Sequence, residues 1–394
     1  MKKIKGIIKH YAWGGYSFIA SILGREPGDT PNAELWFGDH KDGAASLEDG
    51  TSLKELITSY PQFFLGEKVQ QQYGCRLPFL LKILDVRAPL SIQVHPTIEQ
   101  AHQGFLRENS LNIESGLRNY KDDNHKPELM LALSDFYLLH GFKFRDKTVE
   151  ELKKYRSFAP LLVQYQTAGL KDFVEYIFHL AQEKLNSIVG PVVDEFTPAY
   201  GSHLISKKEP LFWFIRAALQ AKKDGRPYDP GLIMIFIMNL VYMTEGQVIF
   251  QGAGVPHAYL EGINVELMSN SDNVVRGGLT VKHVDVDELL KITRFEQFSP
   301  KLLAGVKKSG DEIAFYPPVK DFVLSRFTLK KDRKVNICSD GAPSIILVLS
   351  GYIIDSKKSH EIGSGEAIYL MPDECCELLA LSDTSFVRAY CAVN

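Results

Sequence analysis

A block of amphipathic helices interrupts a chain that otherwise has the pattern of short β-strands. In residues 147–229, apolar side chains recur at helical spacing with charged residues between them, as at Phe173, Tyr176 and Ile177. The residues on either side form short apolar or alternating runs separated by Gly, Pro and Asp, which is typical of strands. This order predicts a mainly β chain with an inserted α-helical domain.

The changes of pattern predict three domains. A discontinuous β domain, residues 1–146 and 230–295, is split by the helical domain at 147–229, and a second β domain covers 296–394. Few residue types used in catalysis cluster in this last domain, so we interpret it as a packing or oligomerisation domain built as a small jelly roll. Its expected strands are 322–329, 344–349, 367–371 and 385–393.

Further elements follow from local patterns. Ser52 and Glu55 predict a capping box at the start of a short helix, and Asp229-Pro230 predicts the start of a buried helix ending near Met243. Strands are expected at 79–86, 90–96 and 129–133, and helices at 97–106 and 211–223. Lys82, inside the first of these strands, either reaches the surface or enters a polar cavity.

Bulk properties exclude several classes of protein. The formal net charge is -3, with no long run of like charges, so no broad nucleic-acid or membrane surface is expected. The longest apolar run, 231–243, is too short to span a bilayer. Five cysteines without a CxxC pair predict reduced thiols. We therefore expect a cytoplasmic protein that is a monomer or a weak oligomer.

The strand Leu90–Pro96 presents polar groups together. Its period-two alternation turns Ser91, Gln93 and His95 to one face and the aliphatic side chains to the other. Such a face is either an ordinary polar surface or part of a metal site. A second concentration of polar groups, His125-Lys126-Pro127-Glu128, stands at the mouth of the next strand, where it is either a strand-edge loop or part of the same site.

A third motif connects these two. Gly254-Val255-Pro256-His257 resembles the second half of a cupin signature, in which a Gly turn presents a histidine inside a jelly roll. Together with Gln93, His95 and Glu128, His257 completes a set of two imidazoles, one carboxylate and one amide. This set suits one borderline divalent ion such as Zn²⁺, with an open position for water or substrate.

Several stretches in the same order closely resemble type I mannose-6-phosphate isomerases. They are residues 11–14, 33–38, 90–96, 125–128, 254–260 and 271–282. The resemblance implies a zinc site of Gln93, His95, Glu128 and His257, one ion per chain, within a cupin-like jelly roll. It further implies an inserted helical domain and a second, C-terminal jelly roll. Departures from the family pattern, at Lys41 and Val281, flank the matching residues rather than replacing them.

The resemblance implies an aldose-ketose isomerase that interconverts mannose 6-phosphate and fructose 6-phosphate through an enediol. Arg276 falls on the family's catalytic arginine, where a guanidinium would stabilise charge on the enediolate. His125, Lys126 and Asp272 fall on polar active-site positions. The general base is one of His125, Lys126 and Glu266, and Asp272 is expected to orient His125.

The phosphate of the sugar needs several hydrogen-bond donors. Ser91 and Lys282, and also Lys82, are suitable in type, although each is equally well explained as a strand hydroxyl or a solvated charge. Two other functions remain open at this stage. One is a non-catalytic cupin-like protein that binds or senses a sugar phosphate, and the other is an iron-dependent cupin dioxygenase.

Overall fold

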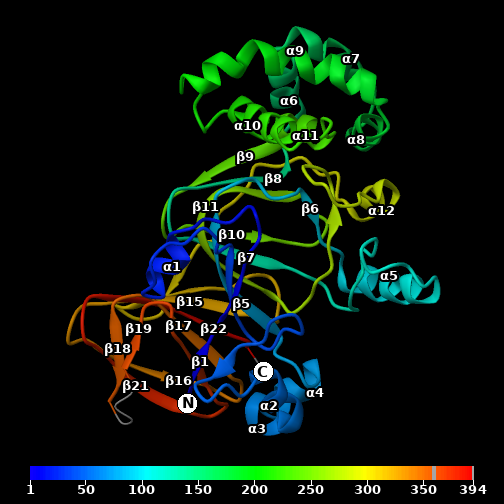
Figure 1. Cartoon of the computed structure of the whole chain (residues 1–394). Coiled ribbons are helices and arrows are strands. Elements are labelled where there is room, and N and C mark those ends of the chain that lie inside the picture. The colour runs from blue at the N-terminus through cyan, green and yellow to red at the C-terminus, as the bar shows by residue number, and fades with distance from the viewer. Residues whose placement is uncertain (357–360, 393–394) are drawn as a thin grey trace.

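The structure is a computed structural model that describes residues 1–356 and 361–392. Three regions follow one another along its long axis (Figure 1): a cap of helices, a central barrel of strands, and a pair of sheets beside which both chain termini lie. The predicted fold class, two cupin-like jelly rolls with an inserted helical domain, is confirmed.

The central barrel is a ten-stranded sheet whose strands come from both sides of the helical cap. Its strands are β2 (Ile7–Lys9), β3 (Glu34–Phe37), β5 (Phe79–Val86), β6 (Gln93–Val94), β7 (Glu128–Ala132), β8 (Phe136–Phe142), β9 (Met238–Met243), β10 (Val248–Gln251), β11 (His257–Ser269) and β12 (Val275–Arg276). The expected strand at 90–96 is regular only over β6, and all eight residues of β5 are buried, so Lys82 enters the barrel.

Strand β11 closes this barrel. Its first residue pairs with β6 and β8, whereas its second half pairs with β5 and β7. Between these halves lies a bulge at Tyr259/Glu261, followed by Gly262 with φ +133°. A Cβ at position 262 would lie 2.4 Å from a ring carbon of Phe136, so only glycine fits where the strand bends. The bend turns residues from both halves toward one interior.

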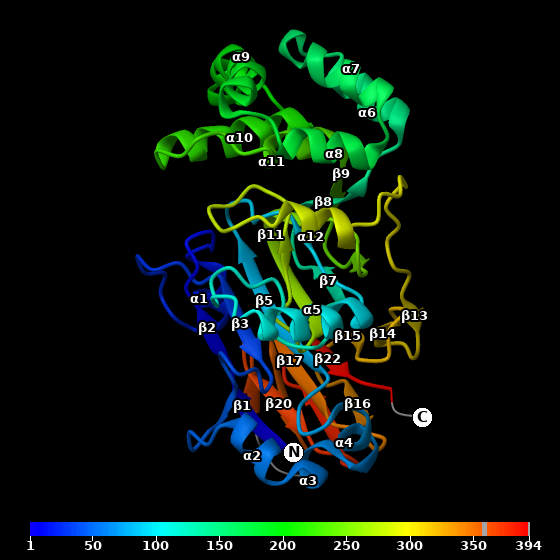
Figure 2. The ribbon, with the colours of Figure 1, turned by 90° about the vertical axis from the view of Figure 1, so that its right-hand side faces the viewer.

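The helical cap leaves the barrel after β8 and returns at β9. These two strands pair with each other, so a large insertion between them leaves the barrel intact. The cap, seen from the side in Figure 2, consists of α6 (Arg145–Leu152), the 3₁₀ turn η1 (Arg156–Phe158), α7 (Ala159–Thr167), α8 (Leu170–Phe178), α9 (Gln182–Gly201), α10 (Pro210–Lys223) and α11 (Gly231–Ile237). Aromatic residues such as Trp213 and Phe236 fill its core.

Two predictions about helices were wrong in detail. The buried helix expected to end near Met243 ends at Ile237, and the chain continues directly as strand β9. Ser52 precedes α2, but its side chain makes no capping hydrogen bond in the described structure. The capping box is instead at α5, where Thr97 and Gln100 bond each other's backbone N–H. The helices outside the cap are α1 (Phe18–Ile22), α2 (Leu53–Ser59), α3 (Pro61–Leu65), α4 (Glu67–Tyr73), α5 (Ile98–Ser110) and α12 (Val286–Ile292).

The third region is a sandwich of two sheets. The larger contains β1 (Lys2–Lys5), β4 (Ser46–Leu47), β13 (Val306–Lys307), β14 (Glu312–Phe315), β15 (Val323–Leu329), β17 (Ser344–Ser350), β20 (Ala367–Leu370) and β22 (Thr384–Tyr390); the smaller contains β16 (Lys334–Cys338), β18 (Tyr352–Asp355), β19 (Glu361–Gly363) and β21 (Cys375–Ala380). The four expected strands are present, although residue 393 of the last lies outside the described residues. The first strand, β1, pairs with β20, so the chain begins in this sheet rather than in the barrel.

The sandwich packs against the barrel. Leu129 and Leu267 of the barrel share one buried apolar cluster with Leu347 and Tyr369 of the sandwich. This contact supports a packing role for the sandwich, whereas the predicted domain boundaries, the oligomeric state and the cellular compartment stay predictions. Among the described residues, every helix is too short or too polar to span a bilayer.

The prediction that all five cysteines are reduced was wrong for one pair. Cys338 and Cys375 are joined by a disulfide, while Cys75, Cys376 and Cys391 are free thiols. The bonded cysteines are opposite each other on β16 and β21. The two cysteines are 37 residues apart in the sequence, so no short cysteine spacing marks them as a pair.

Candidate metal and active site

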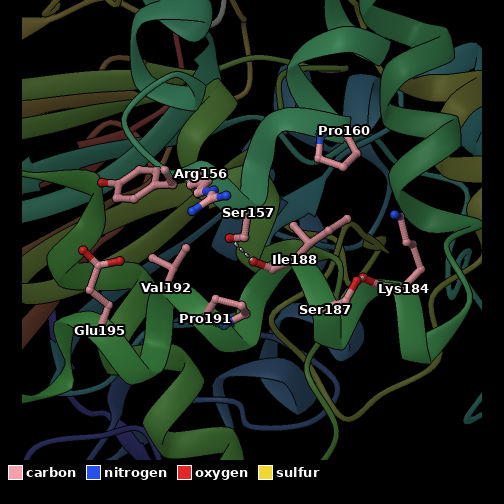
Figure 3. Close-up of a pocket in the computed structure, with 10 residues that line it drawn as sticks. Arg156, Ser157, Pro160, Lys184, Ser187, Ile188, Pro191, Val192 and Glu195 are labelled. Carbon is pink, nitrogen blue, oxygen red and sulfur yellow. Dashed lines mark hydrogen bonds between the residues drawn. The ribbon is translucent and has the colours of Figure 1, made fainter.

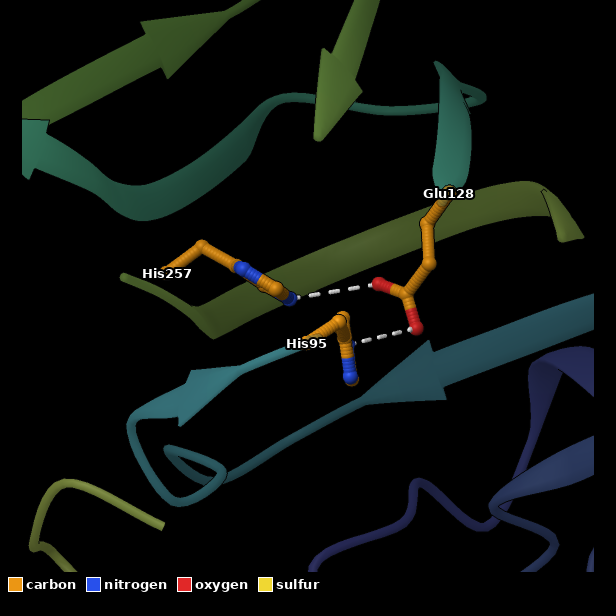
Figure 4. A group of neighbouring side chains, drawn as sticks. All are labelled: His95, Glu128 and His257. Atoms are coloured by element: carbon orange, nitrogen blue, oxygen red, sulfur yellow. Dashed lines mark ion pairs between the residues drawn. The ribbon is translucent and has the colours of Figure 1, made fainter. Parts of the chain in front are cut away.

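Three side chains from separate strands converge inside the barrel (Figure 4). His95 follows β6, Glu128 begins β7 and His257 begins β11. Glu128 Oε1 lies 3.2 Å from His95 Nε2, and Glu128 Oε2 lies 3.2 Å from His257 Nε2. Each of the three residues is at most 3% exposed. The four positions predicted to bind metal therefore include three that meet at one point.

Hydrogen bonds at the other ring nitrogens fix the tautomers of both imidazoles. His95 Nδ1 lies 2.8 Å from the backbone oxygen of Asn273, and His257 Nδ1 lies 3.0 Å from that of Val255. A carbonyl oxygen only accepts, so each Nδ1 carries a proton, and Nε2 is the ring atom that each histidine turns toward Glu128. Burial lowers the pKa of His95 to about 4, so this ring is neutral near pH 7.

This arrangement fits a bound cation. Nε2 of each histidine faces one oxygen of the same carboxylate, and the neutral ring of His95 offers a lone pair there. Within the described structure, His95 Nε2 has no hydrogen-bond partner. Backbone carbonyls that hold the far nitrogen of ligating histidines are a common feature of metal sites. His95, Glu128 and His257 therefore form a site able to hold a divalent metal ion.

Gln93 lies next to this group. It is the ladder partner of His257 across β6 and β11, so the two side chains project from the same face. Its other ladder partner is Arg276 on β12. The pairing brings the predicted amide ligand and the predicted catalytic arginine to adjacent positions beside the two histidines.

Two buried lysines face the carboxylates of the barrel. Lys126 Nζ lies 3.0 Å from Glu128 Oε1, and Lys82 Nζ lies 3.0 Å from Glu266 Oε2. Lys82 also lies 3.7 Å from Glu34. Burial opposes the charge on Lys82, but the two glutamates outweigh burial and hold the pKa of Lys82 above its ordinary value. Lys82 is thus committed to carboxylates, contrary to its expected role as a phosphate ligand.

Glu266 is a carboxylate with unusual proton affinity. Burial raises the pKa of Glu266, and the nearby charge of Glu128 acts in the same direction, whereas Lys82 and Lys126 oppose them. The balance leaves the pKa of Glu266 above the ordinary value for a glutamate. A carboxylate poised in this way is suited to accept and return a proton.

The expected pairing of Asp272 with His125 was wrong. His125 Nε2 lies 2.9 Å from Asp321 Oδ1, on the loop that leads into β15. Asp272 instead lies 3.2 Å from both His40 Nε2 and Lys41 Nζ. Burial alone would raise the pKa of Asp272, but His40 and Lys41 hold it well below its usual range. Asp272 therefore does not orient His125.

The orientation of His125 also separates it from the metal group. Neighbouring residues of an extended chain point to opposite sides, and Lys126 is the one that contacts Glu128. His125 is turned toward the sandwich, where Asp321 also accepts a hydrogen bond from Ser269 at 2.9 Å. Lys126 rather than His125 faces the predicted metal.

Arg276, Lys282 and Lys121 form a group of cations. The pKa of Lys282 is lowered first by burial and then by the charges of Arg276 and Lys121. Within residues 1–356 and 361–392, none of the three forms an ion pair with a carboxylate. Ser91, half-buried and close in sequence to Gln93, begins the same polar strand. These cations are therefore suited to bind the anionic group of a ligand.

Several polar partners escaped prediction. Glu34 was passed over because its stretch was recognised only by its Gly and aromatic residues, and its carboxylate accepts a hydrogen bond from Trp36 Nε1. Lys121 and Asp321 lie in bends outside the motifs. The sequence signal available for Glu34 was a carboxylate within an otherwise apolar run. No comparable signal marks Lys121 or Asp321.

A separate pocket lies in the helical cap (Figure 3). It has a volume of about 510 Å³ and opens between η1 and α9, where Ser157 donates a hydrogen bond to the backbone oxygen of Ile188. Its lining includes Arg156, Lys184 and Glu195, but none of the residues predicted to bind metal or substrate. It is therefore distinct from the metal group.

Comparisons with known proteins identify the family of this chain. Residues 1–145 match the family model described as "Phosphomannose isomerase type I, catalytic domain". The chain is 33% identical over 384 residues to mannose-6-phosphate isomerase of Escherichia coli, covering 95% of each protein. The chain belongs to the mannose-6-phosphate isomerase family. Mannose-6-phosphate isomerase 1 of Arabidopsis thaliana is 31% identical, covering 99% of this chain and 93% of the relative.

Solved structures of this family share the whole fold. The apo form of mannose 6-phosphate isomerase from Salmonella typhimurium superposes with a TM-score of 0.84 at 30% identity, covering 99% of both chains. A mannose 6-phosphate isomerase bound with zinc and yttrium gives a TM-score of 0.84 at 29% identity with the same coverage. The predicted enzyme class, an isomerase, is confirmed, and the non-catalytic alternative is not favoured.

Proposed function

We propose that this enzyme interconverts mannose 6-phosphate and fructose 6-phosphate through an enediol intermediate. The observation that carries the proposal is the convergence of His95, Glu128 and His257 at one point inside the barrel. The names of the family members supply the substrate, and the chemistry of the side chains supplies the mechanism.

One Zn²⁺ per chain would be held by Gln93, His95, Glu128 and His257. Two neutral imidazoles, a carboxylate and an amide oxygen match the preferences of this ion and leave room for a further ligand. When bound, Zn²⁺ polarises nearby oxygens and stabilises negative charge in the pocket. The zinc found in a related solved structure supports this choice.

The substrate's phosphate would bind at Lys282 and Lys121, with Ser91 as an additional hydroxyl donor. Both lysines lack carboxylate partners within the described residues, so binding a dianion would relieve their mutual repulsion and that with Arg276. Arg276, beside Gln93 in the ladder, would stabilise the charge that grows on O1 and O2 of the sugar through paired N–H donors.

Proton transfer between C1 and C2 would use Glu266 and Lys126. Glu266, held as a carboxylate by Lys82, is in the form that removes a proton, and its raised pKa favours that transfer. Lys126, whose Nζ lies 3.0 Å from Glu128 Oε1, would donate hydrogen bonds to the enediolate oxygens. His125 and Asp272 then act from outside the reacting group.

Removal of the metal tests this function. We expect a chelator-treated chain to lose isomerisation of mannose 6-phosphate in a coupled assay, and added Zn²⁺ to restore it, because the metal is an electrophile of the proposed reaction. Fructose 6-phosphate formed by the metal-free chain at the original rate would contradict the zinc proposal. Oxygen consumption without isomerisation would instead identify an iron-dependent dioxygenase.

Separate substitutions of the neighbouring residues Lys126 and His125 test the role proposed for Lys126. We expect Lys126→Met to lower kcat about 10²-fold, whereas His125→Ala lowers it less than about tenfold, because only Lys126 contacts Glu128. The two kcat values, measured with the metal content of each variant, decide between them. A greater loss in His125→Ala than in Lys126→Met would show that His125 rather than Lys126 acts on the substrate.

A further inference from the structure

The loop that follows Arg276 is fastened to the helical cap by a single carboxylate. Asp229 Oδ1 accepts a hydrogen bond from the backbone N–H of Gly231 at 2.6 Å and another from that of Leu279 at 2.8 Å. The first of these donors begins α11, and the second belongs to the loop between β12 and α12. One oxygen atom therefore joins two segments that are 50 residues apart in the chain.

The two backbones at this junction touch. A Cβ at Gly278 would lie 2.6 Å from Gly231 Cα, and a Cβ at Gly231 would lie 2.5 Å from the backbone nitrogen of Leu279. Glycine is therefore required on both sides of the contact, and Gly278 also has φ +102°. Such a contact has little freedom to shift while Asp229 holds both N–H groups.

Leu279 is held in an unusual conformation at the same place. Its φ is +55°, a region that a leucine seldom occupies, and its side chain packs against the apolar core of the helical cap. A residue keeps such a conformation only where its surroundings hold it there. The hydrogen bond that the Leu279 N–H donates to Asp229 and the packing of the side chain are those constraints.

On its other side, the same loop is bonded to the strand that carries a predicted metal ligand. Gly277 N–H donates to the backbone oxygen of Ile92 at 2.8 Å, and Ile92 N–H donates to Gly278 at 3.0 Å. Ile92 directly precedes Gln93, whose ladder partner is Arg276. The segment of Arg276 is thus held between the metal-ligand strand and Asp229.

We propose that Asp229 is a positioning residue for the isomerase reaction, through which the helical cap sets the place of Arg276 and Lys282 beside the metal. This inference rests on the proposed function. Arg276 makes no ion pair with any described side chain, so the position of its guanidinium depends on its backbone. The cap acquires a role in catalysis although none of its helices supplies a group to the reaction.

Kinetics of four variants test the inference. We expect Asp229→Ala to lower kcat for mannose 6-phosphate about 10- to 100-fold with unchanged metal content, because small displacements of a catalytic group have effects of this size. Asp229→Asn keeps an oxygen that accepts both N–H groups and should restore most of kcat. Asp224→Ala, five residues earlier, removes an exposed carboxylate that, among the described residues, bonds Arg226 and Gln220 only, and this variant should leave kcat unchanged. In an Arg276→Ala background, Asp229→Ala should change kcat much less, because the group it positions is gone.

The outcomes separate this inference from the proposed function. A wild-type chain without isomerase activity overturns both. An active wild-type chain in which Asp229→Ala keeps the wild-type kcat, or loses the same factor with and without Arg276, overturns the inference alone. If Asp229→Ala does not fold, Leu279→Gly replaces it. This variant removes the packing of the leucine side chain, whereas glycine readily adopts the same backbone conformation. It should lower kcat and keep its metal. An unchanged kcat in Leu279→Gly also overturns the inference.

Discussion

A Glu128→Ala variant is expected to lose most of its bound metal and about 10³-fold or more of its activity. Glu128 supplies the only charge among the proposed ligands and faces both histidine nitrogens at 3.2 Å. Loss of one preorganised electrostatic contact at a reacting centre lowers rates about 10²- to 10³-fold, and here the metal leaves as well. Metal analysis and kcat, measured on the same preparation, check this expectation.

The same substitution has a second effect that must be separated from the first. It leaves buried Lys126 without its partner, and breaking a buried ion pair in this way destabilises a protein by about 3–5 kcal/mol. Denaturant unfolding therefore accompanies the assay. A double variant, Glu128→Ala with Lys126→Met, removes the unpaired charge and should regain stability but not metal. The control is Glu245→Ala, an exposed carboxylate that pairs with Arg326. Full activity of Glu128→Ala in chelator-treated buffer would refute the metal site.

The sequence predicts correctly those elements whose pattern of apolar side chains and whose length indicate the same type of structure. The helical block was visible because its apolar residues recur at helical spacing, and β5 and β7 because short apolar runs end at turn residues. The error at α11 and β9 has the same origin. Residues 231–243 form one apolar run, and periodicity cannot distinguish a buried helix from a buried strand.

Contacts between distant segments were beyond prediction from one sequence. The pairing of β1 with β20 places the first residues in the last sheet, and no local pattern marks such a partner. The disulfide between Cys338 and Cys375 depends on the register of two strands in the same way.

The site shows the same division. Gln93, His95, Glu128 and His257 were found because motifs carry them, and three of these residues meet in the barrel. The partners of the remaining polar groups were set by the fold. His125 bonds Asp321 across 196 residues, which excludes the expected dyad of His125 with Asp272. Motifs therefore indicate candidate side chains, and only the folded structure shows which of these side chains lie together.

Among residues that bind no metal, Arg276 is expected to show the largest effect on turnover. Arg276→Ala should lower kcat about 10²- to 10³-fold, because it removes the guanidinium that faces the developing enediolate.

Metal content of this variant should stay at the wild-type level, since Arg276 is joined to the ligand strand through backbone bonds that an alanine also makes. Arg276→Lys keeps the charge but not the paired N–H donors, so it should recover only part of the loss.

Arg294→Ala is the matched control, because the side chain of this exposed arginine, among the described residues, bonds only the neighbouring Glu296. Equal losses of metal and kcat in Arg276→Ala would show that the guanidinium supports the fold of the site rather than the reaction. A loss of kcat with metal retained would instead place Arg276 at the reacting oxygens, where its charge matters only once the enediolate begins to form.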